Sequence, residues 1–293
     1  RPGDTDSIKQ NVYSSGSTQK ELNLKEGFSR VLASDYNNYY GIDVREGEHT
    51  VVLDGLAIVR DHTFLTVRSG ATLNLKLTGK SYLKSGSAPA IYVEQGGTLN
   101  LIGEGMAQSS LALMGGLSAA SGATVNFKDC AIYTAGKTIG GTGANVSVEN
   151  CWISAGFAGN LRVTRSTLEG EHSGGTVKID RRSNANLTDA SGKAITGVTD
   201  HSGNPVYRTK VELEDMGKSR NLMMIAYRTD ATVGIMQSIL YPLVTQLRVN
   251  IPNTVNDDVI KDLTMLVSDN TVYLWLPNGT RIMSVEGFQD DGS

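Results

Sequence analysis

Short phrases of alternating apolar and polar residues recur along most of this chain, and they constrain its fold more than any other feature. The clearest copies span residues 50–58, 124–132, 145–153 and 160–168. Shorter copies begin at positions 72, 98 and 176, so the seven starts are separated by steps of 22, 26, 26, 21, 15 and 16 residues. Self-similarity at such a period is typical of a solenoid.

Each copy has the pattern of a strand with one buried face, because apolar residues occupy every second position. A two-residue step then precedes a second apolar pair, such as Cys130 and Ile132, which indicates a corner followed by another strand. One short strand per side, repeated once per coil, predicts a parallel β-helix. Leucine-rich repeats share this period, but the chain lacks their leucine frame. The predicted inward ladder consists of Val51, Leu53, Leu73, Leu75, Leu99, Leu101, Val125, Phe127, Val146, Val148, Leu161, Val163, Val177 and Ile179. The steps of 15 and 16 residues are short for three strands, so we expect the coils to taper or to lose a side after residue 145.

The pattern divides the chain into four parts. We expect a polar leader over residues 1–20, a β-helix with an N-terminal cap over 21–186, and a turn-rich linker over 187–205. Residues 206–293 then form a small β-sandwich-like domain. Its predicted strands cover 206–213, 222–228, 233–240, 247–251, 263–267 and 271–276, with a helical turn at 256–263 and Trp275 in the core.

Two cysteines, Cys130 and Cys151, occupy equivalent positions of neighbouring copies. Stacking at one strand spacing, roughly 4.8 Å, brings them close to each other. Two small buried side chains in the inward ladder are the first interpretation. A disulfide and a reactive thiol remain open, although parallel side chains are poorly placed for the disulfide torsion.

The composition excludes several function classes. Charged residues make up 19% of the chain and the net charge is −3, so no nucleic-acid partner is predicted. The chain contains no run of eighteen apolar residues, which is about the length needed to span a membrane. The four histidines lie in different coils or linkers without metal-ligand spacing, so we predict no metal site and no cofactor.

Three segments carry a family resemblance, at residues 90–101, 138–143 and 273–279. With these, the chain resembles secreted or surface proteins of gut Bacteroidetes that join a right-handed, single-stranded parallel β-helix of the carbohydrate-binding type to a C-terminal all-β module. The resemblance implies an all-β fold of that kind, a bacterial extracellular or cell-surface location, and a polysaccharide or surface glycan as the partner.

Catalysis has residue requirements that can be compared with the repeat columns. β-Helical lyases need clustered carboxylates for calcium and a basic residue, and hydrolases need paired acids. The outward column Asn74, Asn100, Asn126, Ser147, Arg162 and Lys178 contains no carboxylate, and the next column has only Glu149 and Asp180, which are not adjacent. A non-catalytic glycan-binding or adhesion role is therefore favoured. A polysaccharide lyase or glycoside hydrolase, and a purely structural stalk, remain as alternatives.

The candidate ligand-binding residues are Asn100, Asn126, Tyr133 and Trp152. The asparagines form either a structural amide ladder or a row of groups that hydrogen-bond sugar hydroxyls. Trp152 occupies an outward slot filled by alanine in other copies, so its indole is either exposed for stacking on a sugar or packed under another segment.

Overall fold

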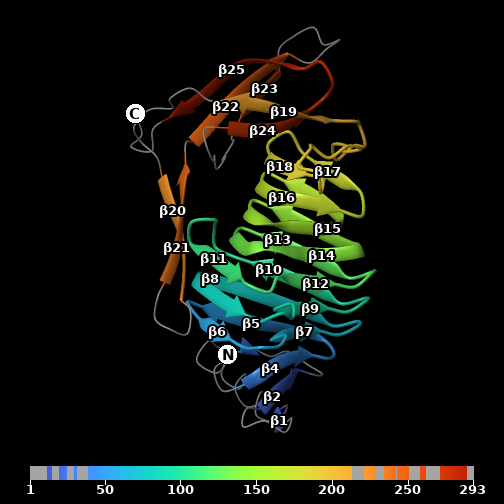
Figure 1. Cartoon of the computed structure of the whole chain (residues 1–293), viewed down its shortest axis with the longest axis vertical. Coiled ribbons are helices and arrows are strands. Elements are labelled where there is room, and N and C mark those ends of the chain that lie inside the picture. Colours follow the sequence, from blue (N-terminus) through green and yellow to red (C-terminus); the bar gives the residue numbers. More distant parts are fainter. Residues whose placement is uncertain are drawn as a thin grey trace.

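The computed structural model describes residues 12–14, 20–24, 30–31, 39–212, 221–228, 234–241, 243–250, 258–261 and 271–288, with side chains over 41–212 and 271–283. Figure 1 shows a tall stack of strands with antiparallel strands at its C-terminal end and alongside it. The described segments are all-β. None of them forms an apolar helix of membrane-spanning length.

Parallel strands build the stack in three columns, and the chain passes from column to column as it rises. The first column contains β3 (Arg30–Val31), β5 (Glu48–Asp54), β8 (Thr72–Lys84), β10 (Thr98–Ile102), β13 (Thr124–Lys128), β14 (Ala131–Glu149), β15 (Trp152–Thr164) and β17 (Val177–Ile179). Three of these strands are long enough to continue around a corner into another column.

The second column pairs β6 (Ala57–Val59), the end of β8, β11 (Ser109–Leu113), the starts of β14 and β15, β16 (Thr167–Ser173) and β18 (Asn184–Thr188). The third pairs β2 (Lys20–Leu24), β4 (Tyr39–Val44), β7 (Leu65–Val67), β9 (Ile91–Val93), β12 (Leu117–Ala119), the middles of β14 and β15, and the end of β16. The N-terminal segment expected to cap the stack thus adds the parallel strands β2, β3 and β4 to it. β1 (Val12–Ser14) pairs with β2 in the antiparallel sense.

The inward ladder is confirmed, since all fourteen predicted residues are buried in one hydrophobic core. The alignment of the first copy is wrong by two residues, because Thr72 pairs with Glu48 and Thr50 pairs with Asn74. A shift of two leaves every side chain on the same face, so alternation alone does not detect it.

The short coils keep all three sides, contrary to the expectation that a side could be lost. β15 runs through the three columns with only single-residue bends, pairing near Ile153, Phe157 and Val163 in turn. Gly159 makes one bend at φ 94°, and a side chain there would collide with the carbonyl oxygens of Gly141 and Ala144. The coil shortens because its loops disappear.

At the C-terminal end, β24 (Thr271–Leu276) lies on β18 and closes the core. Trp275 is buried in the same cluster as the inward ladder, and its Nε1 donates to the Ala185 carbonyl at 2.8 Å. Tyr273 N donates to Asn184 Oδ1 at 2.8 Å. The prediction that Trp275 is a core residue is confirmed, and the core it completes is that of the stack.

The remaining strands are antiparallel. β19 (Tyr207–Glu212) pairs with β24, β20 (Asn221–Arg228) with β21 (Gly234–Tyr241), and β22 (Leu243–Asn250) with both β23 (Asp258–Lys261) and β25 (Arg281–Phe288). The prediction of a helical turn at 256–263 is wrong for residues 258–261, which form the strand β23. The strand predicted at 263–267 lies outside the described residues. The sandwich arrangement and the domain boundaries stay predictions.

Candidate functional site

The outward face of the first column carries a continuous amide ladder, defined as Asn74, Asn100, Asn126 and Ser147. Asn100 Nδ2 donates to Asn74 Oδ1 at 3.0 Å, and Asn126 Nδ2 donates to Asn100 Oδ1 at 2.9 Å. At its two ends, Asn74 donates to Glu48 Oε1 and Ser147 Oγ donates to Asn126 Oδ1. The ladder forms because parallel pairing sets these residues side by side.

A second outward row lies two residues earlier in each strand. Asn160 Nδ2 donates to Asn145 Oδ1 at 3.0 Å, while Asn160 Oδ1 accepts from the backbone N and the Oγ1 of Thr176. A side-chain amide has two N–H donors and two acceptor lone pairs. Each asparagine of both rows therefore retains hydrogen-bonding capacity after its bond to the next coil.

Between these rows lies an open groove of about 300 Å³ that crosses four coils. It is lined by Thr124, Asn126, Asn145, Val146, Ser147, Asn160, Leu161, Arg162, Thr176 and Lys178. Amides, hydroxyls and two cations supply its polar groups, and no carboxylate or aromatic ring is among them. Such a lining can donate to and accept from hydroxyl groups along an extended ligand.

The row of the amide ladder ends in the two cations. Arg162 pairs with Ser147 on one side and with Lys178 on the other. Arg162 is exposed and Lys178 is half-buried. Among the described residues, neither side chain has a hydrogen-bond or ion-pair partner, so the C-terminal part of the groove offers two unpaired cations.

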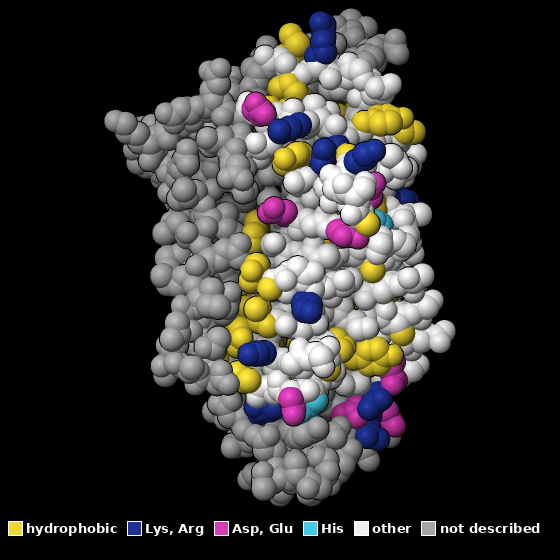
Figure 2. Space-filling model, in the orientation of Figure 1, with side chains coloured by type: hydrophobic (Ala, Val, Ile, Leu, Met, Phe, Trp, Pro, Cys, Tyr) yellow, Lys and Arg dark blue, Asp and Glu magenta, His cyan; other side chains and the backbone are white. Residues whose placement is uncertain are grey.

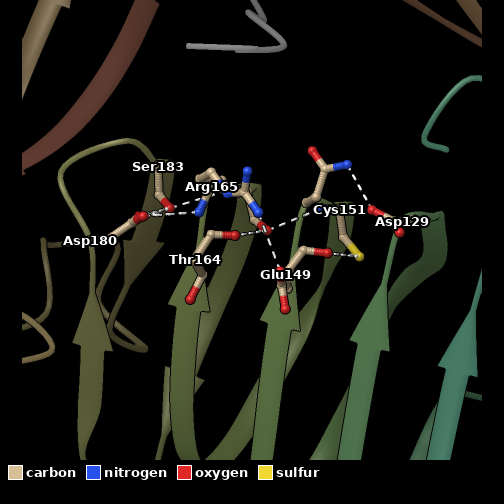
Figure 3. A network of polar contacts seen from close by, with 9 residues as sticks. Asp129, Glu149, Cys151, Thr164, Arg165, Asp180 and Ser183 are labelled. Carbon is tan, nitrogen blue, oxygen red and sulfur yellow. Dashed lines mark hydrogen bonds and ion pairs between the residues drawn. The ribbon is translucent and has the colours of Figure 1, made fainter. Parts of the chain in front are cut away.

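The nearest carboxylates of the next outward row are engaged in a corner network, shown in Figure 3. Glu149 Oε1 lies 3.2 Å from Arg165 Nη2. Asp180 accepts from the Arg165 backbone N and from Ser183 Oγ at 2.5 Å. These contacts hold the corner, where Arg165 has a left-handed φ of 43°. They direct the two carboxylates toward Arg165 and Ser183.

The two predicted asparagines therefore lie on the groove face, whereas the two predicted aromatic residues lie around the corner on the second column. Trp152 is 5% exposed and packs with Tyr82, Met106, Ala112 and Ala131, which together form the outer cluster. Tyr133 packs against this cluster and is half-buried. The first column thus carries the hydrogen-bonding groups, and the indole of Trp152 is not open to solvent.

The outer cluster belongs to an apolar stripe. Figure 2 shows hydrophobic side chains in a line over the region of β8 and β11. β20 lies beside these two strands. Of the two interpretations of Trp152, packing is the one the structure shows, while the role of all four predicted residues in ligand binding stays a prediction.

Sequence reasoning selected Asn126 from the groove lining and missed its seven other polar residues: Thr124, Asn145, Ser147, Asn160, Arg162, Thr176 and Lys178. A signal for them existed. The register that aligns Asn100 with Asn126 also sets Ser147, Arg162 and Lys178 in the same outward row. The row two residues earlier contains Thr124, Asn145, Asn160 and Thr176.

The cysteines are two free buried thiols whose sulfur atoms lie 3.7 Å apart. Burial raises the pKa of the Cys130 thiol, and the neighbouring Cys151 raises it further. Of the three interpretations, the structure therefore supports two small buried side chains in the inward ladder, and not a disulfide or a reactive thiolate. Within the described residues, no three His, Cys, Asp or Glu side chains are grouped to hold a metal ion.

Comparison with protein-family models, with curated proteins and with solved structures gives no match to this chain. Function is therefore inferred from the chemistry of the groove.

Proposed function

We propose that this chain is a non-catalytic glycan-binding or adhesion protein of the bacterial cell surface or extracellular space. The groove on the first column is its binding site. The observation that carries the proposal is the repetition of amide and hydroxyl groups in register across four coils.

Polysaccharides are repeating ligands that present hydroxyl groups at regular intervals. Adjacent parallel strands lie about 4.8 Å apart, so a chain lying across the coils meets one similar set of partners per strand. Because the ladder bonds fix the asparagine side chains before binding, little further conformational entropy is lost when a sugar replaces water.

We also propose that the stack winds as a right-handed, single-stranded parallel β-helix and that the C-terminal strands form a sandwich-like unit. Connections between parallel strands of one sheet are right-handed in about 98% of cases. The three columns of parallel strands support this class, and an experimental structure tests the hand directly.

A glycan array with a groove-filling variant tests the binding function. Asn145 is exposed in the groove, so Asn145→Trp should fold and occlude the site. Lys76→Trp adds the same side chain at an exposed position of β8 outside the groove. We expect wild type and Lys76→Trp to bind the same glycans and Asn145→Trp to lose them.

Equal binding by all three proteins would place the site elsewhere. Absence of binding to any glycan, with no release of unsaturated or reducing ends from polysaccharides, would leave the structural stalk. Release of such ends would establish an enzyme.

A further inference from the structure

We propose that the groove selects acidic glycans, with Arg162 and Lys178 together holding a carboxylate or sulfate of the ligand. This inference rests on the proposed glycan-binding function and deepens it by naming the class of glycan. Its basis is the pair of cations at the end of the amide ladder, which have no hydrogen-bond or ion-pair partner among the described residues.

The register of β15 and β17 sets the two cations next to each other. Arg162 and Lys178 are direct partners in parallel pairing, about one strand spacing of 4.8 Å apart. Both line the groove. An anionic group between them can accept hydrogen bonds from the guanidinium and from the ammonium, and such charge-assisted bonds are shorter and stronger than neutral ones.

Among the described residues, the two acids of the next outward row form no ion pair with Arg162 or Lys178. Glu149 is bonded to Arg165, and Asp180 accepts from the backbone of Arg165 and from Ser183. Like charges placed opposite each other on neighbouring strands disfavour the folded state. An anion bound between Arg162 and Lys178 relieves that repulsion, so the charge of the site favours an acidic ligand over a neutral one.

The rest of the lining favours a glycan over a nucleic acid as the source of the anion. Proteins that bind single-stranded nucleic acid combine a basic groove with aromatic rings on which bases stack. The groove has no aromatic lining residue, and its other polar groups are amides and hydroxyls suited to sugar hydroxyls. The net charge of −3 also argues against a general polyanion surface.

The test measures binding of the full chain to matched acidic and neutral polysaccharides by calorimetry. Polygalacturonate is compared with its fully methyl-esterified form, and carboxymethylcellulose with hydroxyethylcellulose. Arg162→Gln and Lys178→Gln remove one charge each and retain a polar side chain. Lys76→Gln, at an exposed site of β8 outside the groove, is the control for net charge.

We expect at least one acidic polymer to bind more tightly than its neutral counterpart. Each groove substitution should weaken that binding about tenfold, as expected for one charge-assisted hydrogen bond. Lys76→Gln should leave the affinity unchanged. Added salt should weaken binding by the wild type more than binding by a variant that carries both Arg162→Gln and Lys178→Gln. Binding of a neutral polymer that Asn145→Trp abolishes but Arg162→Gln and Lys178→Gln leave intact would overturn the acidic preference while glycan binding stands. Equal losses in the groove variants and in Lys76→Gln would also overturn it, as would tighter binding of a single-stranded oligonucleotide. Failure of every glycan on the array would remove both proposals.

Discussion

The outward faces of the first and second columns differ, although both stand on the same buried ladder. On the first column the outward residues that line the open groove are asparagine, serine, threonine, arginine and lysine. On the second column the outward residues include Tyr82, Ala112, Ala131 and Trp152, which pack into a second hydrophobic cluster. The inward pattern thus determines the stack, while the outward rows decide whether a face stays polar and open or packs against other side chains.

The contrast shows that an outward aromatic side chain on a repeat strand is not by itself a ligand platform. Trp152 faces away from the main core and is still only 5% exposed. A face that is apolar over several coils is a packing surface for another part of the chain, and here β20 lies beside its strands β8 and β11.

The largest expected effect concerns the ladder beneath both faces. Phe127 is 1% exposed in the core, and Phe127→Ala should lower the free energy of unfolding by about 3–5 kcal/mol. Chemical denaturation measures the loss, with Phe127→Leu as a milder comparison. A loss below about 1 kcal/mol would mean that Phe127 is not inside the stack.

The second column can be tested through Trp152. Trp152→Ala leaves a cavity in the outer cluster, so unfolding free energy should fall by about 2–3 kcal/mol, somewhat less than for a fully enclosed tryptophan. Glycan affinity of the folded variant should stay that of wild type. Trp152→Phe should retain most of the stability. Loss of glycan binding by Trp152→Ala with an unchanged unfolding curve would contradict the assignment of the second column as a packing face.

Substitutions on the outward face of the first column should cost much less stability than Trp152→Ala. Asn100→Ala removes the ladder bonds to Asn74 and Asn126. The expected destabilisation is only about 1 kcal/mol, because these bonds are partly buried and water can replace them. Thr98→Ala, on the neighbouring outward row, should have less effect. Denaturation curves decide this. A cost as large as that of Phe127→Ala would make the amide face a structural element.

The third column provides the smallest effect and a dependence on pH. The hydrogen bond from Arg68 Nη1 to Glu94 Oε1, at 2.8 Å, lowers the pKa of Glu94. Because the pKa of Glu94 is lower in the folded state, its ionisation stabilises the fold at pH values above the unfolded-state pKa of about 4.3. This stabilisation is lost as the pH falls through the folded-state pKa.

Glu94→Gln should therefore be slightly less stable than wild type at pH 7, and the difference should vanish in acid. Unfolding measured from pH 7 to pH 2.5 tests this, with the exposed Glu171→Gln as the control. A difference that grows on acidification would contradict the assigned pairing.

Much of the stack could be predicted from the sequence, because its inward residues alternate and its columns repeat. Three features could not. The two-residue offset of the first copy preserves alternation, as described for Thr50 and Asn74. The burial of Trp152 depends on packing across coils that no local pattern encodes. Trp275 was predicted as a core residue, but its place in the core of the stack depends on β18, ninety residues earlier.

The site was half accessible to prediction. Asn100 and Asn126 were selected because amides recur in one outward row, and Asn126 lines the groove. Arg162 and Lys178 stand in the same column but were assessed only for the absence of carboxylates. Their significance depends on the corner contacts of Glu149 and Asp180, since these acids are bonded to Arg165 and Ser183 and not to the two cations. Those contacts require the three-dimensional arrangement.

The division between a binding face and a packing face is tested most directly by a crystal structure with an acidic oligosaccharide that binds in solution. We predict sugar density along the groove from Asn126 to Lys178, with the acidic group between Arg162 and Lys178. Density over Tyr133 and Trp152 on the second column, with the groove empty, would contradict the division.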